Sequence, residues 1–218
     1  MSSVTVVLAD VRGLSLGDAA LVLETLCGQA DRVAARCDAT VRGPLAEKFP
    51  EAVGVAWDVP MDGHVLMVTA PVAFGPGAVA SLVQRAAVPG RIVTRVFLPD
   101  SGGSSMIALW SAEWLTEHGI DGDRLPELGL TFDNAHLPHD HPQARAWIPA
   151  DEVGVVPTSE VGPDLEAWAR AERNRVRRQS RWSGVRARLG TVRRELRLLR
   201  QRRAHRRRTA AGTGVRAP

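Results

Sequence analysis

The sequence of 218 residues is 44% apolar, which is enough for one globular core of ordinary size and an appendage. Its formal net charge of +4 is the sum of an acidic part and a basic part of the chain. Residues 1–163 hold 10 Lys and Arg against 20 Asp and Glu, whereas residues 164–218 hold 18 against 4. The basic character belongs to the tail, so it gives no reason to expect nucleic-acid binding by the acidic domain over 1–163.

Cysteine content and hydropathy favour a soluble protein of a reducing compartment. Cys27 and Cys37 are too few for a disulfide framework and lack the partners of a zinc motif, so we expect buried, reduced thiols. No basic segment precedes the short apolar run after Met1, and no apolar stretch approaches the roughly 20 residues that span a bilayer. These features predict a cytoplasmic location.

The first half of the chain alternates predicted strands and helices. Val4–Ala9 is apolar without polar alternation, which predicts a strand buried on both faces. Apolar residues recur at helical spacing over Ala19–Leu26. The next expected elements are a strand at Asp31–Cys37, a short helix at Pro44–Phe49 and a third strand at Ala52–Trp57.

The alternation continues in the second half. His64–Thr69 predicts another buried strand, and Arg91–Leu98 predicts a strand with one wet face. We expect helices at Ala78–Ala87 and Met106–His118, loops over 120–149, and a last short strand at Glu152–Val156. This order predicts a three-layer α/β domain with a mostly parallel, GT-A or Rossmann-like sheet.

Several local patterns carry candidate chemistry. Gly75-Pro76-Gly77 fits the start of a dinucleotide fingerprint, but five residues separate it from the preceding strand, so we interpret it as a turn before a helix. The cluster at 136–141 has a composition that could bind a metal, yet prolines interrupt it, so a polar loop is favoured, with Asp140 as its catalytic candidate. Asp10 and Asp38 follow predicted strands, where ligands bind in open α/β sheets.

Taken in order, these segments resemble a family-2-type glycosyltransferase with the GT-A fold. The matching segments are Val4–Asp10, Asp31–Thr40, His64–Ala80, Met106–Trp114 and Leu137–Trp147. The resemblance implies nucleotide binding by Asp10, Arg12 and Asp38. It also implies a general-base role for Asp140, which would deprotonate an acceptor hydroxyl in sugar transfer from a nucleotide-sugar.

One departure from the family concerns the metal. The family holds Mn²⁺ or Mg²⁺ with a D-x-D motif, and this chain has Thr69-Ala70-Pro71 at that position. None of these side chains is a carboxylate ligand, so no metal is expected there. Either the domain is a non-catalytic partner, or cations such as Arg12 or Arg95 replace the metal.

The tail predicts an Arg-rich amphipathic helix over 164–208, followed by a disordered end at 209–218. Trp182 begins an apolar stripe with spacings of three and four, and arginines fill the other faces. An anionic membrane surface suits this pattern best, an acidic protein partner comes next, and nucleic acid is the third alternative. The residues expected to contact an anionic surface are Arg181, Trp182, Arg186, Arg188, Arg193, Arg194, Arg197 and Arg200.

These observations lead to one expected function and one alternative. We expect a glycosyltransferase-like protein of bacterial cell-surface polysaccharide assembly, bound peripherally at the inner membrane face. The alternative is a non-catalytic scaffold that its basic tail attaches to the membrane surface.

Overall fold

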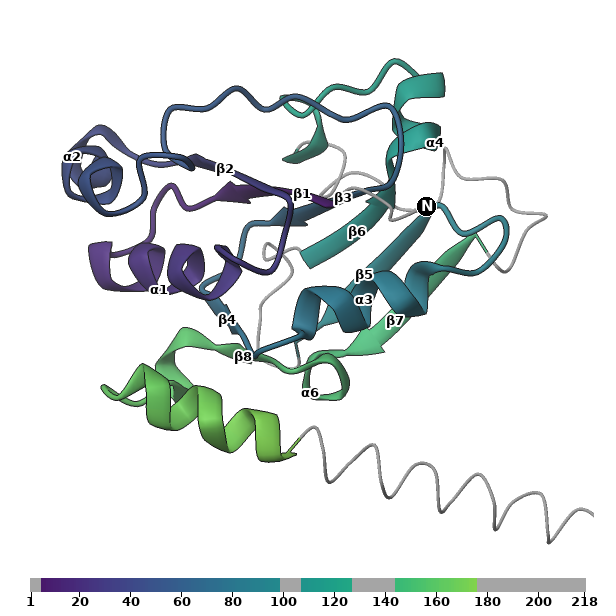
Figure 1. Ribbon diagram of the computed structural model, residues 1–218. Coiled ribbons are helices and arrows are strands. Elements are labelled where there is room, and N and C mark those ends of the chain that lie inside the picture. Colours follow the sequence, from purple (N-terminus) through teal and green to yellow (C-terminus); the bar gives the residue numbers. More distant parts are fainter. Residues whose placement is uncertain (1–4, 99–106, 127–143, 176–218) are drawn as a thin grey trace, which may run out of the picture. The chain divides into compact units, whose positions relative to one another are not determined.

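The protein is built around a six-stranded sheet. The computed structural model describes residues 5–98, 107–126 and 144–175 (Figure 1). The strands, in spatial order, are β2 (Arg32–Arg36), β1 (Thr5–Asp10), β3 (His64–Val68), β6 (Ile107–Ser111), β5 (Val93–Phe97) and β7 (Arg145–Pro149). Only β6 runs against the other five. The α/β class and the mostly parallel sheet are therefore confirmed.

Helices and a small second sheet complete this arrangement. The described residues include the helices α1 (Leu16–Leu26), α2 (Ala39–Lys48), α3 (Ala78–Ala86), α4 (Ala112–Glu117), α6 (Ala150–Val153) and the 3₁₀ turn η1 (Thr158–Glu160). The second sheet pairs β4 (Val72–Phe74) antiparallel to β8 (Val155–Pro157). Of the helices in the described residues, none has the length and apolar composition needed to cross a membrane.

Two apolar cores lie on opposite faces of the sheet. Because side chains alternate along a strand, β1 sends Val7 to a first core with α1 and α3, and Leu8 to a second core with α4. Figure 1 shows α1 and α3 on one side of the sheet and α4 on the other. Burial of both faces explains why β1 and β3 are apolar throughout.

The connections reverse direction around β1. The chain passes from β1 through α1 to β2 on one side, and then returns to β3 on the other side. In open α/β sheets such a reversal, at the carboxyl ends of the strands, is where ligands bind. The segments that follow β1, β2 and β3 are therefore the first place to examine for a site.

Two sequence predictions in the middle of the chain are wrong. Met106–His118 was expected to be one helix, but Ile107–Ser111 is the strand β6, and the helix begins only at Ala112. The run is apolar because β6 is buried between β3 and β5, and the hydroxyl of Ser111 then accepts the Trp114 N–H and starts α4. Ala52–Trp57 contributes only an isolated bridge between Val53 and Ala35.

Element boundaries also differ from expectation elsewhere. The strand β7 was missed because residues 120–149 were expected to be loops, and β4 was missed because it is short. The short helix expected at Pro44–Phe49 is α2, which begins five residues earlier, at Ala39. The last strand lies at Val155–Pro157, one residue beyond the expected end, and it follows the short helix α6.

The turn η1 is joined to the first-core side of the domain by hydrogen bonds of Thr158. The Thr158 hydroxyl donates to Asp18 of α1 at 2.7 Å, and the Thr158 N–H donates to the carbonyl of Pro71. Residues 165–175 are helical, and Asp164 accepts the Ala167 N–H at the helix start, as the sequence predicts. The first compact unit ends at Glu172, and Arg173–Pro218 forms the second.

Gly122 provides a test of close packing in the second core. A Cβ at residue 122 would overlap the carbonyl oxygen of Trp57 and touch Leu8. We expect Gly122→Ala to lower the free energy of unfolding by about 1–3 kcal/mol, as overpacking does. Gly17→Ala in the exposed first turn of α1 meets only an ordinary contact, so it should raise that free energy by about 0.4–1 kcal/mol. Urea unfolding of both variants measures the contrast.

Asp18 gives the fold a pH dependence. Hydrogen bonds from Ser15 and then Thr158 lower the pKa of the Asp18 carboxyl below the ordinary aspartate value. The carboxylate therefore contributes stability above the unfolded-state pKa, and this contribution is lost as the pH falls through the folded-state pKa. We expect the difference in Tm between wild type and Asp18→Asn to shrink from roughly pH 5 to pH 2. Asp62→Asn, at an exposed loop aspartate, is the control for loss of a carboxylate that is outside this hydrogen-bond arrangement.

Candidate functional site

The loop after β1 holds an acid–base pair at the carboxyl edge of the sheet. Asp10 ends β1, and its two carboxylate oxygens accept hydrogen bonds from Nε and Nη2 of Arg12 at 2.8 and 2.5 Å. The Asp10 side chain is 11% exposed and the Arg12 side chain 53%. The hydrogen bond to Asp10, and then the charge of that carboxylate, raise the pKa of the Arg12 guanidinium. Arg12 is thus a permanent cation with an outward face.

Asp38 connects the neighbouring loop to the same place. It precedes α2 at the position of a capping residue, but its side chain makes no capping hydrogen bond to that helix. Instead its carboxylate accepts the backbone N–H of Gly13 at 2.7 Å, across 25 residues of sequence. The structure therefore brings Asp10, Arg12 and Asp38 together, and their role in nucleotide binding stays a prediction.

A second arginine lies next to this group and was not found from the sequence. Arg36 ends β2 directly opposite Asp10 in the sheet register. Its guanidinium forms an ion pair with Asp123 and lies 4.0 Å from the centre of the Trp57 ring. The only sequence signal was its place at a strand end, because both partners are distant in sequence. Arg36 thus holds Asp123 beside the carboxyl end of β2.

In the segment that replaces the metal motif, the middle side chain is buried and two backbone carbonyls are hydrogen-bonded within the fold. Ala70 is 1% exposed and belongs to the first core. The Ala70 carbonyl accepts the Val72 N–H, and the Pro71 carbonyl accepts the Thr158 N–H. Within the described residues, no three His, Cys, Asp or Glu side chains group in a way that could hold a metal ion. The residues present at 69–71 therefore do not fit a divalent cation.

The other candidates have different outcomes. Asp140, its neighbouring histidines and the tail residues from Arg181 onward lie outside the described residues. Gly75-Pro76-Gly77 is a turn between β4 and α3. It directly follows a strand, but that strand belongs to the two-stranded antiparallel sheet and not to the parallel sheet in which a dinucleotide fingerprint lies. Cys27 and Cys37 are free, but Cys27 is exposed at the end of α1 and Cys37 is half-buried, so the prediction of buried thiols is wrong.

The side chains at this edge of the sheet are suited to binding a ligand. The Asp10 and Asp38 carboxylates can accept hydrogen bonds from hydroxyl or amide groups, and the exposed guanidinium of Arg12 can pair with phosphate oxygens. These three groups stand where the first two parallel strands end. The arrangement therefore suits a ligand that combines hydroxyls with an anionic group.

Comparison with known proteins gives no match: no family model, curated protein or solved structure is similar to this chain.

Introducing an acid at the middle position of residues 69–71 tests whether residue 70 faces a site or the first core. We expect Ala70→Asp to lower the free energy of unfolding by about 3 kcal/mol or more, because it places a carboxylate in the first core. Thr69→Asp changes the preceding, half-buried residue and should lower the free energy of unfolding by about 1 kcal/mol. Thermal and urea unfolding measure both. Equal costs would contradict the burial of residue 70.

Proposed function

We propose that this protein binds a nucleotide-sugar at the carboxyl ends of β1 and β2, as a glycosyltransferase-like protein of bacterial cell-surface polysaccharide assembly. The observation that carries the proposal is the convergence of Asp10, Arg12 and Asp38. The hydrogen bond from Gly13 to Asp38 joins the loop that follows β1 to the loop that follows β2. A nucleotide-sugar offers both chemistries that this group can recognise, namely hydroxyls and phosphates.

The arrangement of the sheet supports the same proposal at the level of the fold. Helices cover both faces, and the connections reverse around β1, as expected for a three-layer domain of the GT-A or Rossmann-like type. A fold alone hosts many functions, so it adds only plausibility. The site residues carry the functional part of the proposal.

Each site residue has a proposed role. Asp38 accepts hydrogen bonds from the nucleoside while it continues to hold Gly13. Arg12, oriented by Asp10, supplies the positive charge beside the phosphates that a divalent cation supplies in the family. If sugar transfer occurs, Asp140 acts as the general base toward the acceptor hydroxyl.

A non-catalytic scaffold is the second candidate, and the lack of a carboxylate side chain among residues 69–71 favours it. A domain without metal-ligating carboxylates at this position lacks one source of charge stabilisation during departure of the nucleoside diphosphate. In this alternative the fold is retained for partner binding, and the basic tail attaches the protein to the inner face of the membrane.

Isothermal titration of the full chain with common nucleotide-sugars, with and without Mn²⁺, tests the proposal. We expect binding that does not require Mn²⁺ and that weakens as salt increases, because Arg12 provides the charge. Arg12→Ala should weaken binding about tenfold or more, the loss typical of a charge-assisted hydrogen bond. Asp38→Asn should weaken binding of the nucleoside part by a similar factor.

Arg85→Ala provides the matched control. Arg85 on α3 is also an exposed arginine in an ion pair, with Glu152 at 2.8 Å, but it lies far along the chain from the site. Its loss should leave nucleotide-sugar binding unchanged. Absence of binding for every common nucleotide-sugar would remove the leading proposal and leave the scaffold.

A further inference from the structure

Arg36 presents a stacked guanidinium at the edge of the sheet where the proposed site lies. Its guanidinium carbon lies 4.0 Å from the centre of the Trp57 ring, and its Nη2 pairs with Asp123. Trp57 is 6% exposed and belongs to the second core, so the indole covers one face of the planar guanidinium from the core side. The Arg36 side chain is 33% exposed. Solvent therefore reaches the face of the guanidinium that the indole does not cover.

The surroundings hold this stack in place. The backbone at Gly122 approaches the carbonyl oxygen of Trp57 so closely that a Cβ at residue 122 would overlap it. This contact fixes the position of the next residue, Asp123, which pairs with Arg36. The guanidinium is thus held by three segments: the end of β2, the loop that contains Trp57 and the segment after α4. A plane that is already fixed loses little conformational entropy when a ligand stacks on it.

The stack adjoins the pair formed by Asp10 and Arg12. Arg36 and Asp10 are register partners in the parallel strands β2 and β1, whose backbones lie roughly 5 Å apart. The preceding residues of both strands, Ala35 and Ala9, face the first core. Because side chains alternate along a strand, Arg36 and Asp10 both face the other side of the sheet. The stacked guanidinium and Arg12, which Asp10 orients, therefore lie at the ends of neighbouring strands.

The charges around Arg36 favour an uncharged ligand over a second phosphate. Two arginines and three aspartates meet at this edge of the sheet, so negative charge is in excess: Arg12, Arg36, Asp10, Asp38 and Asp123. A phosphate beside Arg36 would also face the carboxylate of Asp123, which repels it. A flat, uncharged ring can instead cover the guanidinium, and its N–H groups can donate to the carboxylates.

We propose that the outer face of the Arg36 guanidinium is a stacking platform for the nucleobase of the bound nucleotide. The base lies on the guanidinium, the guanidinium lies on Trp57, and the phosphates reach Arg12 at the end of the neighbouring strand. Bases are commonly recognised by stacking on aromatic rings and on arginine planes. The inference rests on the proposed binding of a nucleotide-sugar, and it assigns the residue that holds the base.

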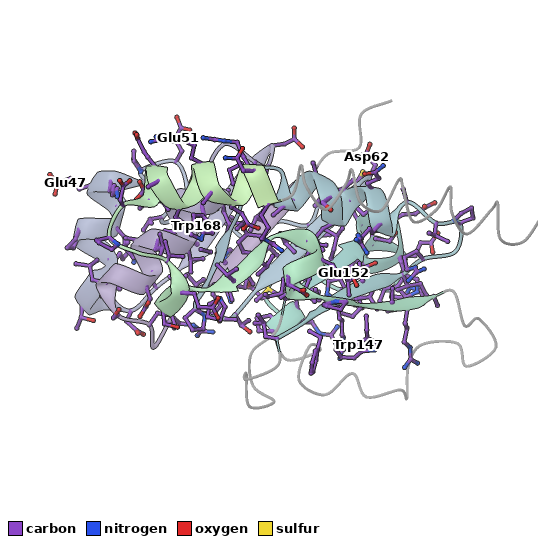
Figure 2. All side chains as sticks on the ribbon, turned by 90° about the horizontal axis from the view of Figure 1, so that it is seen from below. Glu47, Glu51, Asp62, Trp147, Glu152 and Trp168 are labelled. Carbon is purple, nitrogen blue, oxygen red and sulfur yellow. The ribbon has the colours of Figure 1, made fainter. Side chains whose placement is uncertain are left out.

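The exposed tryptophan of β7 does not serve this ligand. Trp147 is 62% exposed, but β7 and β2 are the opposite edge strands of the six-stranded sheet. Figure 2 shows Trp147 far from Glu47 of α2, the helix that follows β2. A nucleotide whose phosphates meet Arg12 does not reach the β7 edge. Arg36 belongs to the strand next to β1, so it provides the stacking surface within reach.

Side-chain NMR of the wild-type full chain tests the platform directly. Spectra of the arginine Nε–H groups are recorded with uridine, guanosine and adenosine monophosphates, and with ribose 5-phosphate, which lacks a base. We expect the Arg36 signal, identified by its absence in Arg36→Lys, to move upfield with a nucleotide that binds, because the ring current of a stacked base shields it. It should stay in place with ribose 5-phosphate. A signal that no bound nucleotide moves upfield would overturn the proposal.

Affinity provides a second measurement. Arg36→Lys keeps the positive charge but removes the plane, so it should weaken nucleotide-sugar binding about tenfold, the loss expected for one stacking contact. Pyrophosphate binding should stay unchanged. Arg32→Lys is the matched control, because Arg32 is on the same strand, is 38% exposed and pairs with Asp58 at 3.5 Å, but it begins β2 at the amino end. Its loss should change neither affinity.

The outcomes separate this inference from the proposed function. Equal nucleotide-sugar affinities of wild type and Arg36→Lys would contradict the platform and leave nucleotide-sugar binding in place. An equal loss of pyrophosphate binding would assign Arg36 to the phosphates and would also contradict the platform. Absence of nucleotide binding by the wild type would overturn both proposals. Circular dichroism verifies that the variants fold, and the wild-type NMR spectra decide the question if one of them does not.

Discussion

The complete burial of β1 is the constraint on which the rest of this structure depends. Val7, Leu8 and Ala9 have no exposed surface, and β1 pairs with β2 on one side and β3 on the other. Its faces and edges are therefore all occupied, and a polar group on this strand can be placed only at its end. Asp10 stands at that end, and the adjacent loop places Arg12 and Gly13 beside Asp38.

The same constraint explains why much of the fold and the site could be predicted from the sequence. A strand buried on both faces leaves a continuous apolar run, which identified β1 and β3. Parallel strands bring their carboxyl ends to one edge, so acids that follow successive strands come together even without a local motif. Asp10 and Asp38 were found in this way, and their carboxylates lie where β1 and β2 end.

Elements that are defined by distant partners could not be predicted. The apolar run of β6 has the composition of a buried strand or of a buried helix, and periodicity does not separate the two when both faces are covered. Its identity comes from pairing with β3 and β5. Arg36 is a similar case, because Asp123 is 87 residues away and no local spacing connects the two.

The short link between β3 and β4 limits the chemistry that the site can perform. Three residues separate these strands, and the side chain of the middle one, Ala70, is enclosed by the first core. None of the three side chains is a carboxylate that could hold a divalent cation. Positive charge for a phosphate would then come from Arg12, whose guanidinium already shares its charge with Asp10. A diphosphate would meet only the outward face of that guanidinium. Under the proposed function, anion binding is consequently moderate and sensitive to salt, which suits recognition of a nucleotide better than strong stabilisation of a departing one.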